Sequence, residues 1–256
     1  MLPLMAIMGT LDAERRRTAL TTQAHTDGGV QIEIAAQHFD VSPMTIRRDL
    51  IELEAEGKVQ RVRGGAIGAP APRPFRERQS TRPSAKMLIA RKASVLVPSR
   101  GVIALDASTT ISYLAAALST PDGLMMCTNS IETFSELRAK DGIQPILSGG
   151  EPEPTTGSLV GPLAHQTVKM LHFDIFFASA SALDGKGSSE VSLAEADIKR
   201  AFAANSCETV LCIDSSKLDQ QLVARAVSEM EITTIVTELN PTDARLTAYG
   251  RFADLI

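Results

Sequence analysis

The carboxy-terminal two thirds of the chain repeat one pattern, in which short apolar runs alternate with stretches of helical periodicity. The apolar runs occupy residues 102–106, 124–128, 143–150, 174–178, 209–214 and 233–237, and helical patterns cover residues 109–118, 130–140 and 193–204. Because the runs are continuously apolar, each strand must be buried on both faces. The pattern therefore predicts an α/β domain over residues 84–256, with a Rossmann-like, mainly parallel sheet between helices.

Small polar and charged residues follow four of these predicted strands. They are Asp106, Ser108, Thr109 and Thr110, then Thr128, Asn129 and Ser130, then Gly149 and Gly150, and finally Asp214, Ser215, Ser216 and Lys217. Open parallel sheets bind ligands beyond the carboxyl ends of their strands, and hydroxyls and N–H groups at a helix start suit a phosphate. The alternative is that residues 108–110 only cap a helix and that residues 214–217 form a turn. The four loops together favour a ligand site.

A different pattern precedes this domain. The helix expected around residues 14–24 has few residues to bury, namely Ala19, Leu20 and Ala24. The next short helix has an apolar stripe with three- and four-residue steps, made of Ile32, Ala35, Ala36 and Phe39. Asp40 and Val41 then form a predicted turn. Ser42 is a good N-cap for a further helix, and Pro43 suits the first helical position, where a missing N–H costs nothing.

The helix that begins at Pro43 has a buried face and a basic outer face. The predicted buried face consists of Ile46, Leu50 and Leu53, and the outer face of Met44, Thr45, Arg47 and Arg48. The outer residues occupy the turns that reach base edges and phosphates in a helix-turn-helix. Gly57 is expected to end the helix. Residues 58–68, KVQRVRGGAIG, predict the wing of a winged helix, in which Val59, Val62 and Ile67 alternate imperfectly with Lys58, Arg61 and Arg63. Each feature alone is common on ordinary solvated helices, and only their order favours a DNA-binding module.

Charge is unevenly distributed along the chain. Residues 1–92 contain 15 Lys or Arg against 10 Asp or Glu, whereas the whole chain has a formal net charge of −4. This asymmetry predicts a polyanion-binding module joined to a domain that does not bind polyanions. The absence of Trp and an aromatic content of 4% argue against a sugar-stacking groove or a base-stacking platform. Cys127, Cys207 and Cys212 lack metal-ligand spacing, so we expect buried, reduced thiols and no metal site.

Residues 41–66, VSPMTIRRDLIELEAEGKVQRVRGGA, resemble the DNA-binding signature of the DeoR family of bacterial transcription regulators. The residues in register are Val41, Ser42, Thr45, Ile46, Arg47, Arg48, Asp49, Leu50, Leu53, Glu54, Gly57, Arg61, Gly64, Gly65 and Ala66. We expect DNA contacts from Ser42, Met44, Thr45, Arg47, Arg48, Arg61, Arg63, Gly64 and Gly65. Arg47 and Arg48 each suit a bidentate contact to guanine or phosphate. Asp49 is expected to orient or pair one of them, because phosphate would repel it.

The resemblance extends into the α/β domain through the blocks LDASTT, TNS, SGG, EADIKR and DSSK. These are similar to the DeoR effector domain, which shares its fold with ribose-5-phosphate isomerase and glucosamine-6-phosphate deaminase and typically senses a phosphorylated sugar. Together with the strand-end rule, the resemblance implies an effector site of Asp106, Ser108, Thr109, Thr110, Asn129, Gly150, Glu195, Lys199 and Lys217. Ser108, Ser179 and Ala182 stand where the family usually has Gly. Their side chains narrow the pocket, so the effector differs or its binding is weakened.

Three segments follow from these patterns: a winged helix-turn-helix over residues 12–67, a basic Pro-rich linker over 68–83, and an effector-binding α/β domain over 84–256. The linker prolines, which exclude a helix and predict a stiff extended connector, are Pro70, Pro72, Pro74 and Pro83. The linker either only joins the domains or also follows the phosphate backbone. Residues 1–11 are too short to span a bilayer and lack a signal-peptide pattern, so we leave them outside the fold.

Three functions are compatible with these observations. The first is a cytoplasmic DNA-binding transcriptional regulator, in this family most often a repressor of a carbohydrate-metabolism operon. We expect it to bind a double-stranded operator as a homodimer or homotetramer, to respond to a phosphosugar and to need no cofactor or membrane. The second is a sugar-phosphate isomerase or deaminase with an added DNA-binding module. Asp106, Glu195 and Asp214 supply carboxylates for it, but no His lies beside the strand-end motifs and nothing marks a base. The third, an architectural DNA binder, leaves the strand-end residues unexplained.

Overall fold

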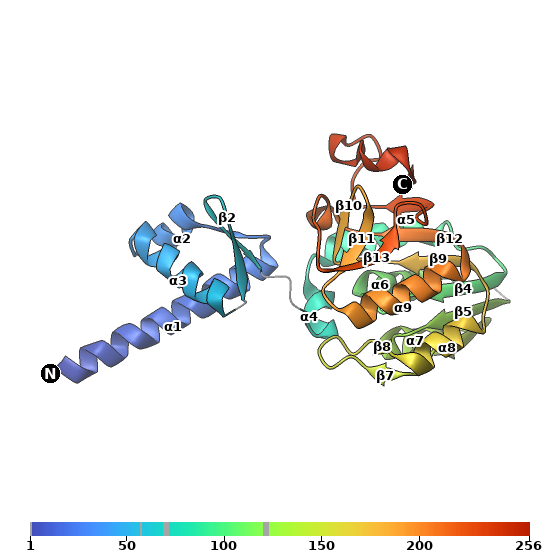
Figure 1. Ribbon diagram of the computed structural model, residues 1–256, viewed down its shortest axis with the longest axis horizontal. Coiled ribbons are helices and arrows are strands. Elements are labelled where there is room, and N and C mark those ends of the chain that lie inside the picture. Colours follow the sequence, from blue (N-terminus) through green and yellow to red (C-terminus); the bar gives the residue numbers. More distant parts are fainter. Residues whose placement is uncertain (1, 57, 69–71, 120–122) are drawn as a thin grey trace. The chain divides into compact units, whose positions relative to one another are not determined.

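The computed structural model describes residues 2–56, 58–68, 72–119 and 123–256, and the chain divides into two compact units, Met1–Ala71 and Pro72–Ile256 (Figure 1). The amino-terminal unit contains α1 (Leu2–Thr26), β1 (Val30–Gln31), α2 (Ile32–His38), α3 (Pro43–Ala55), β2 (Val59–Val62) and β3 (Gly65–Gly68). The carboxy-terminal unit contains α4 (Phe75–Ser80), α5 (Pro83–Ser94), β4 (Gly101–Leu105), α6 (Thr109–Ala117), β5 (Leu124–Thr128), α7 (Ile131–Arg138), β6 (Ile143–Leu147), β7 (Glu151–Pro152), β8 (Leu159–Val160), α8 (Pro162–Lys169), β9 (Phe173–Ala178), β10 (Ala182–Asp184), β11 (Gly187–Glu190), α9 (Leu193–Ala204), β12 (Ser206–Cys212), η1 (Ser215–Lys217), β13 (Ala224–Ser228), β14 (Thr234–Val236), η2 (Ala244–Leu246), η3 (Tyr249–Arg251) and β15 (Asp254–Leu255).

The amino-terminal unit is a winged helix-turn-helix, which confirms the sequence prediction. α2 and α3 form the helix-turn-helix pair, and β2 and β3 form an antiparallel hairpin that β1 extends. Its core consists of Leu20, Ala24, Val30, Ile32, Ala35, Ala36, Ile46, Leu50, Leu53, Val59 and Ala66, with Phe39 and Val41 packed partly buried against it. The predicted apolar stripe of α2 and the predicted buried face of α3 are therefore both present.

Two details of this unit differ from the sequence predictions. α1 begins at Leu2 rather than near residue 12, so the segment left outside the fold continues the first helix. Ala19 is exposed, because Leu20 and Ala24, one helical turn apart, already define the buried side of α1. In β2, Val59 is buried, and Val62, three residues later, is 47% exposed on the opposite face of the strand. Gly57, expected to end α3, lies outside the described residues.

The carboxy-terminal unit is built on a seven-stranded sheet in the order β15-β14-β12-β9-β4-β5-β6, and every pair is parallel. All six strands predicted from the apolar runs are present, and this confirms the expected α/β class. The strand β15 was missed, since its two residues carry no strand pattern. Strand order reverses at β4, which has β5 on one side and β9 on the other. The carboxyl ends of β4 and β9 therefore form a topological switch point.

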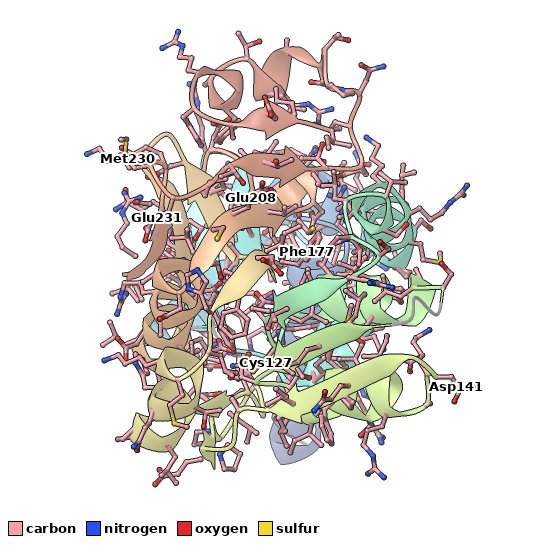
Figure 2. The ribbon with its side chains drawn as sticks, turned by 90° about the vertical axis from the view of Figure 1, so that its right-hand side faces the viewer. Cys127, Asp141, Phe177, Glu208, Met230 and Glu231 are labelled. Carbon is pink, nitrogen blue, oxygen red and sulfur yellow. The ribbon has the colours of Figure 1, made fainter. Side chains whose placement is uncertain are left out.

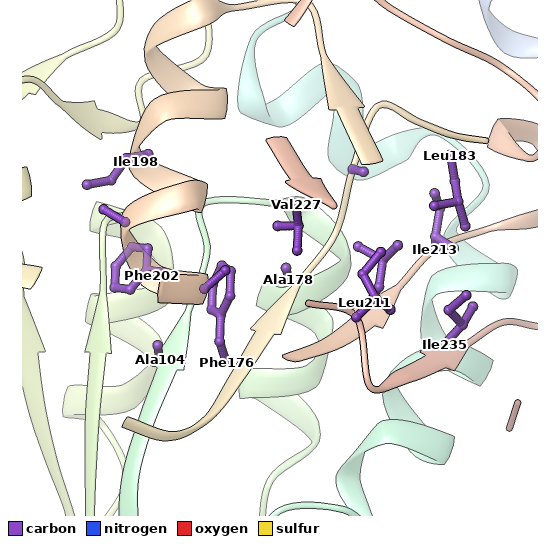
Figure 3. Packing of buried hydrophobic residues seen from close by; sticks show 14 of the residues in the cluster. Ala104, Phe176, Ala178, Leu183, Ile198, Phe202, Leu211, Ile213, Val227 and Ile235 are labelled. Carbon is purple, nitrogen blue, oxygen red and sulfur yellow. The ribbon is translucent and has the colours of Figure 1, made fainter. Parts of the chain in front are cut away.

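Helices cover both faces of this sheet (Figure 1). α5, α6 and α7 contribute Ile89, Ile111, Leu114 and Leu137 to a cluster on one face. α8, α9 and the small antiparallel sheet β10-β11-β13 cover the other face. There Phe202 of α9 stacks on Phe176 of β9, with ring centroids 5.2 Å apart (Figure 3). Figure 2 places Phe177 and Cys127 on central strands and Met230, which is 87% exposed, at the periphery. The sheet and both helical layers thus hold the strand ends in fixed positions.

Residues 75–80 form α4, so the prediction of an extended linker over residues 68–83 is wrong for this part. Pro72 and Pro74 precede α4, and Pro83 is the first residue of α5, so these prolines do not interrupt a helix. Phe75 is only 8% exposed and anchors α4 to the carboxy-terminal unit. Pro70, in the remaining part of the predicted linker, lies outside the described residues. These prolines therefore mark the starts of two helices rather than an extended segment.

The cysteines only partly match expectation. Cys127 and Cys212 are buried, and burial raises the pKa of both thiols, that of Cys127 to about 12. Cys207 is exposed instead of buried, because it lies in the first part of β12, where the strand is not yet buried, and its Sγ lies 3.7 Å from His172 Nε2. Within the described ranges, no group of three His, Cys, Asp or Glu side chains is arranged to hold a metal ion. The described helices also include none with the length and hydropathy needed to cross a membrane.

Candidate DNA-binding surface and effector site

The outer face of α3 presents the predicted recognition residues. Met44 is 55% exposed, and Arg47 and Arg48 are both exposed, whereas Ile46 and Leu50 behind them are fully buried. The buried side chains fix the rotation of α3 about its axis, so the arginines lie on the side away from the core. Two exposed guanidinium groups on the first turns of a capped helix match the geometry of a recognition helix.

Ser42 and Thr45 have a local role at the start of α3. Ser42 Oγ accepts a hydrogen bond from the backbone N–H of Thr45 at 3.1 Å and lies 2.9 Å from Thr45 Oγ1. This N-cap satisfies one of the free N–H groups of the first turn. The two hydroxyls therefore position α3, whether or not they also contact DNA.

Asp49 pairs with α1 rather than with its neighbours. Its carboxylate accepts hydrogen bonds from Arg16 at 2.6 and 3.3 Å, and both side chains are largely buried. The expectation that Asp49 orients or pairs an adjacent arginine is wrong, because Asp49 lies on the inner side of α3. Arg47 instead approaches Glu33 of α2 at 3.9 Å. Arg48 forms no ion pair with any residue that the structure describes, so the exposed arginines remain available to an external anion.

The predicted wing residues differ in their surroundings. Arg61 donates to Glu54 of α3 through its backbone N–H at 2.9 Å and its Nε at 2.7 Å, so this arginine ties the wing to α3. Arg63 is exposed in the turn between β2 and β3. Gly64 has a φ of +86°, which favours glycine in that turn, and a Cβ at Gly65 would lie 1.8 Å from the carbonyl oxygen of Val30. The glycine pair is thus required by the hairpin itself.

In the carboxy-terminal unit, Asp106 lies at the switch point of the sheet and is only 1% exposed. Its Oδ1 accepts the backbone N–H of Ser108 at 2.9 Å. Its Oδ2 accepts the backbone N–H of Ser179 at 2.8 Å, and Nζ of Lys199 lies 3.0 Å from the same oxygen. This carboxylate therefore joins the loops after β4 and β9 to helix α9.

Helix α6 begins directly after this loop. Ser108 Oγ accepts the backbone N–H of Ile111 at 3.2 Å, so Ser108 is the N-cap that the alternative interpretation of the sequence required. Thr109 and Thr110 are 4% and 1% exposed. The positive end of the α6 dipole lies at the carboxyl edge of the sheet, where it favours an anion. A ligand at the start of α6 would therefore be bound by backbone N–H groups rather than by the hydroxyls of Ser108, Thr109 and Thr110.

Asn129, after β5, has an unusual environment. Its Nδ2 donates to the carbonyl oxygen of Leu159 at 3.0 Å, but its buried Oδ1 has no hydrogen-bond partner among the described residues. The buried hydroxyl of Ser179 likewise lacks a partner in the described part of the chain. Buried polar atoms are normally paired, so two unpaired atoms at strand ends are a feature expected of a ligand site. Gly150, by contrast, is required by the fold itself, since a Cβ at this position would lie 2.5 Å from the carbonyl oxygen of Val160.

Lys199 and Glu195 lie on α9. The three N–H groups of Lys199 face Ser179 O at 2.6 Å, Glu190 Oε1 at 2.5 Å and Asp106 Oδ2 at 3.0 Å. The ammonium therefore has no donor left for a ligand, and Lys199 holds Asp106 in position. Glu195 accepts from Ser158 Oγ at 2.8 Å, and burial together with nearby Glu190 raises its pKa.

Lys217 follows β12 in the short helix η1. Its Nζ donates to the carbonyl oxygen of Ala180 at 2.7 Å and lies 3.9 Å from Asp214 Oδ2, and its side chain is 28% exposed. Asp214 also lies 3.3 Å from Nε of Arg82, which pairs with Glu238 at 2.8 Å. Because Lys217 Nζ forms one hydrogen bond, two of its three N–H groups have no acceptor among the described residues. Lys217 is thus the predicted cation that retains capacity for an anionic ligand.

Lys86 and Arg78 belong to the same region but were not predicted. Lys86 is 4% exposed and donates to the carbonyl oxygen of Arg78, and Arg78 donates to Thr156 O at 3.3 Å. The sequence did contain a signal. Lys86 stands in helical register with the buried residues Ile89, Ala90 and Ala93, at steps of three, four and seven. A lysine within the apolar stripe of a helix indicates a buried ammonium.

Burial, with the nearby charge of Lys217, lowers the pKa of Lys86 to about 7. Below that pH the folded state contains a buried charged ammonium. Above it Lys86 is neutral when folded but still charged when unfolded, so the unfolded state binds more protons and stability rises with pH.

We expect the free energy of unfolding of the wild type to rise, relative to Lys86→Gln, from about pH 7 to about pH 9. Urea titrations followed by tyrosine fluorescence measure this, since both tyrosines, Tyr113 and Tyr249, lie in the carboxy-terminal unit. If the difference in free energy of unfolding between the wild type and Lys86→Gln is constant with pH, the pKa of Lys86 is not lowered in the folded state.

Comparison with known proteins agrees with this division of the chain. Residues 16–69 match the model of the DeoR-like helix-turn-helix domain, and residues 81–239 match that of the DeoR C-terminal sensor domain. The L-fucose operon activator of Escherichia coli (strain K12) is 34% identical over 235 residues, which cover 89% of this chain and 92% of that protein. The glycerol-3-phosphate regulon repressor of the same strain is 29% identical over 230 residues, with 89% and 91% covered.

Among solved structures, ribose 5-phosphate isomerase A from Neisseria gonorrhoeae aligns with a TM-score of 0.39 and 20% identity over 55% of this chain and 53% of that one. A TM-score this low says nothing about activity. The sequence matches, by contrast, span both units and include the capped α3 with its arginine pair and the sheet edge around Asp106. The chain therefore belongs to the DeoR family of DNA-binding transcriptional regulators.

Proposed function

We propose that this regulator represses an operon of carbohydrate metabolism and that a phosphorylated sugar, bound at the carboxyl edge of the sheet, controls its affinity for DNA. The observation that best supports the effector site is the switch point itself. There the start of α6, the unpaired Oδ1 of Asn129 and the ammonium of Lys217 come from three separate strand ends. A helix start and a lysine suit a phosphate, and an amide oxygen suits a sugar hydroxyl.

The related regulators support control of carbon metabolism but not one sign of regulation. One is a regulon repressor and another is an operon activator. Repression is our proposal, and activation is the second candidate. A reporter fused to the gene's upstream region, measured with and without the regulator gene, distinguishes them, since loss of a repressor raises expression and loss of an activator lowers it.

An enzyme is less well supported. The Asp106 carboxylate, the obvious base at the switch point, is occupied by Ser108, Ser179 and Lys199. His165 of α8 approaches Asp197, and His172 lies beside Cys207, so neither pairs with a residue of the switch point. Proton transfer from carbon needs a base that is free to accept the proton. Turnover assays with ribose 5-phosphate and glucosamine 6-phosphate test this alternative directly.

Control of DNA binding requires that the sugar binds one arrangement of the regulator better than another. We infer that a homodimer presents two α3 helices to half-sites about one helical turn apart, roughly 34–36 Å, or a multiple of that distance.

Helix α4 couples the sheet edge to the segment that joins the two units, because residues in and just after α4 contact the carboxy-terminal unit. Arg78 of α4 contacts Thr156, and Arg82, just after α4, contacts Asp214 and Glu238. A ligand that changes these contacts moves the segment that leads into the DNA-binding unit.

Lys217→Ala tests the effector site. We expect about tenfold more phosphosugar to be needed for half-maximal release of the operator, since a hydrogen bond to a charged group contributes about 1.5–3 kcal/mol. Affinity for the operator without effector should not change, because Lys217 lies in the carboxy-terminal unit. Gel-shift titrations on the gene's upstream region with a panel of phosphosugars measure both quantities. Lys169→Ala, an exposed lysine on α8, is the matched control. An unaltered response in Lys217→Ala would remove this lysine from the site.

A further inference from the structure

Most lysines and arginines of the amino-terminal unit already lie next to a carboxylate of that unit. Five do so: Arg16 with Asp49, Arg17 with Glu52, Arg47 with Glu33, Lys58 with Glu56 and Arg61 with Glu54. The Arg47 pair, at 3.9 Å between exposed groups, is the loosest of them. The others are exposed and form no ion pair with any described residue: Arg15, Arg48 and Arg63. Arg48 and Arg63 are among the predicted DNA contacts, whereas the sequence assigns no partner to Arg15.

Arg15 lies on the part of α1 that runs towards the start of α3. Along α1, Arg17 pairs with Glu52 of α3, and Arg16 pairs with Asp49, which comes earlier in α3. Lower residue numbers in α1 therefore meet lower residue numbers in α3. One further step along, a groove is lined by Asp12, Arg15, Arg16, Phe39 and Val41. Val41 directly precedes Ser42, the N-cap of α3, so Arg15 lies beside the amino-terminal end of that helix.

The amino-terminal end of a recognition helix is also where DNA phosphates lie close to the protein. The major groove of B-DNA is about 12 Å wide, and an α-helix with its side chains is about 10–12 Å across. A helix in the groove therefore has a row of phosphates on each side, and elements beside its leading end meet these rows. A guanidinium at that place suits a phosphate, to which it donates two parallel hydrogen bonds. Because α1 begins at Leu2, Arg15 is inside the helix, so its side chain must make the contact.

We propose that Arg15 donates to a phosphate at the rim of the major groove, which makes α1 a third DNA-contacting element beside α3 and the wing. Each of these elements then supplies one unpaired arginine: Arg15 from α1, Arg48 from α3 and Arg63 from the turn between β2 and β3. The largely buried pair of Arg16 and Asp49 ties α1 to α3, so a phosphate bound by Arg15 fixes the position of the recognition helix on the duplex. The inference goes beyond the proposed function, because it needs no effector and holds for a repressor and an activator alike.

The competing explanation is that Arg15 is an ordinary solvated arginine. Asp12 lines the same groove and would repel a phosphate, and exposed charges generally contribute little. The salt dependence of binding separates the two explanations, because each phosphate neutralised by a direct contact releases counterions from the DNA. Arg17 is the matched comparison. It lies two residues further along α1, almost on the opposite side of the helix, and already pairs with Glu52, yet Arg17→Gln changes the net charge as much as Arg15→Gln does.

The experiment measures DNA binding of the full-length wild type, Arg15→Gln, Arg15→Lys and Arg17→Gln by fluorescence anisotropy. The probes are a labelled duplex from the gene's upstream region and a random-sequence duplex of equal length, between about 50 and 200 mM KCl. We expect Arg15→Gln to reduce the slope of log affinity against log salt by about 0.9 for each bound subunit, the value for one phosphate contact. Its affinity should fall about three- to tenfold for each subunit on both duplexes, because a phosphate contact reads no sequence. Arg15→Lys and Arg17→Gln should keep the wild-type slope.

Three results overturn the inference. If Arg15→Gln has the slope of the wild type, Arg15 does not contact a phosphate, even where affinity falls. If Arg15→Gln and Arg17→Gln lose the same slope, the loss reflects net charge and not a contact. If Arg15→Gln weakens binding to the upstream duplex but not to the random duplex, Arg15 contacts a base instead. Glutamine forms helices about as well as arginine and both arginines lie outside the apolar core, so circular dichroism should show an unchanged fold in every variant.

Discussion

Replacing Arg47 and Arg48 together with alanine is expected to abolish specific operator binding while leaving both units folded. Each well-placed bidentate arginine contact contributes about 1–3 kcal/mol, so the double variant should lose about 2–6 kcal/mol, a factor of roughly thirty to twenty thousand. The fold should survive, because both side chains are exposed and the core of α3 consists of Ile46, Leu50 and Leu53. Quantitative gel shifts at two salt concentrations measure the loss, and circular dichroism checks the fold.

The matched control for this prediction is Arg100→Ala with Arg138→Ala. It removes the same charge from two exposed arginines of the carboxy-terminal unit, outside the DNA-binding unit. Long-range electrostatics alone would weaken binding about equally in both double variants, whereas a recognition role affects only the first. Retained operator binding in the Arg47 and Arg48 variant would mean that α3 is not the recognition helix.

Lys199→Met is expected to destabilise the carboxy-terminal unit by about 3–5 kcal/mol, the usual cost of removing one member of a buried ionic network. The lysine is the shared partner of Asp106, Glu190 and the carbonyl of Ser179, and its removal leaves two buried carboxylates uncompensated. These carboxylates hold its pKa above the ordinary value despite burial. Urea unfolding followed by the fluorescence of Tyr113 and Tyr249 reports on this unit, since the chain has no Trp.

Two further variants separate charge from packing in that result. Lys186→Met, at an exposed position, should change stability by less than about 0.5 kcal/mol. Glu190→Gln in the Lys199→Met background should recover part of the loss, because it removes one of the uncompensated charges. If Lys199→Met alone costs less than about 1 kcal/mol, the network does not hold the switch point together as described.

Where a feature depends on local chemistry, the sequence was informative. Ser42 and Pro43 mark the start of α3 because capping involves only neighbouring residues, and the structure has this cap. The spacing of Ile46, Leu50 and Leu53 defined the buried face of α3, since helical periodicity decides which side chains share a side. The apolar runs likewise predicted β4, β5, β6, β9, β12 and β14, because a strand buried on both faces must be apolar throughout.

The sequence was less informative about partners far apart in the chain. It suggested that Asp49 serves the adjacent arginines, but Asp49 pairs with Arg16, 33 residues away. It proposed Lys199 as a ligand contact, but all three of its donors are occupied by Ser179, Glu190 and Asp106. It treated residues 68–83 as a linker, but Phe75 is buried and α4 folds onto the carboxy-terminal unit. Ion pairs and packing depend on how the elements meet in space, which local patterns do not encode.

The sequence by itself thus determined the helix-turn-helix, the strands of the sheet and the set of strand ends that meet at one edge. Only the tertiary structure decided which of those polar groups are already paired and which are free. Asp106 and Lys199 are satisfied within the fold, whereas Lys86, Lys217 and Asn129 keep donors or acceptors that find no partner among the residues the structure describes. The physical reason is that residue type fixes how many donors and acceptors a side chain has. Whether they find partners depends on the neighbours that the packing of β4, β9, α5 and α9 brings together.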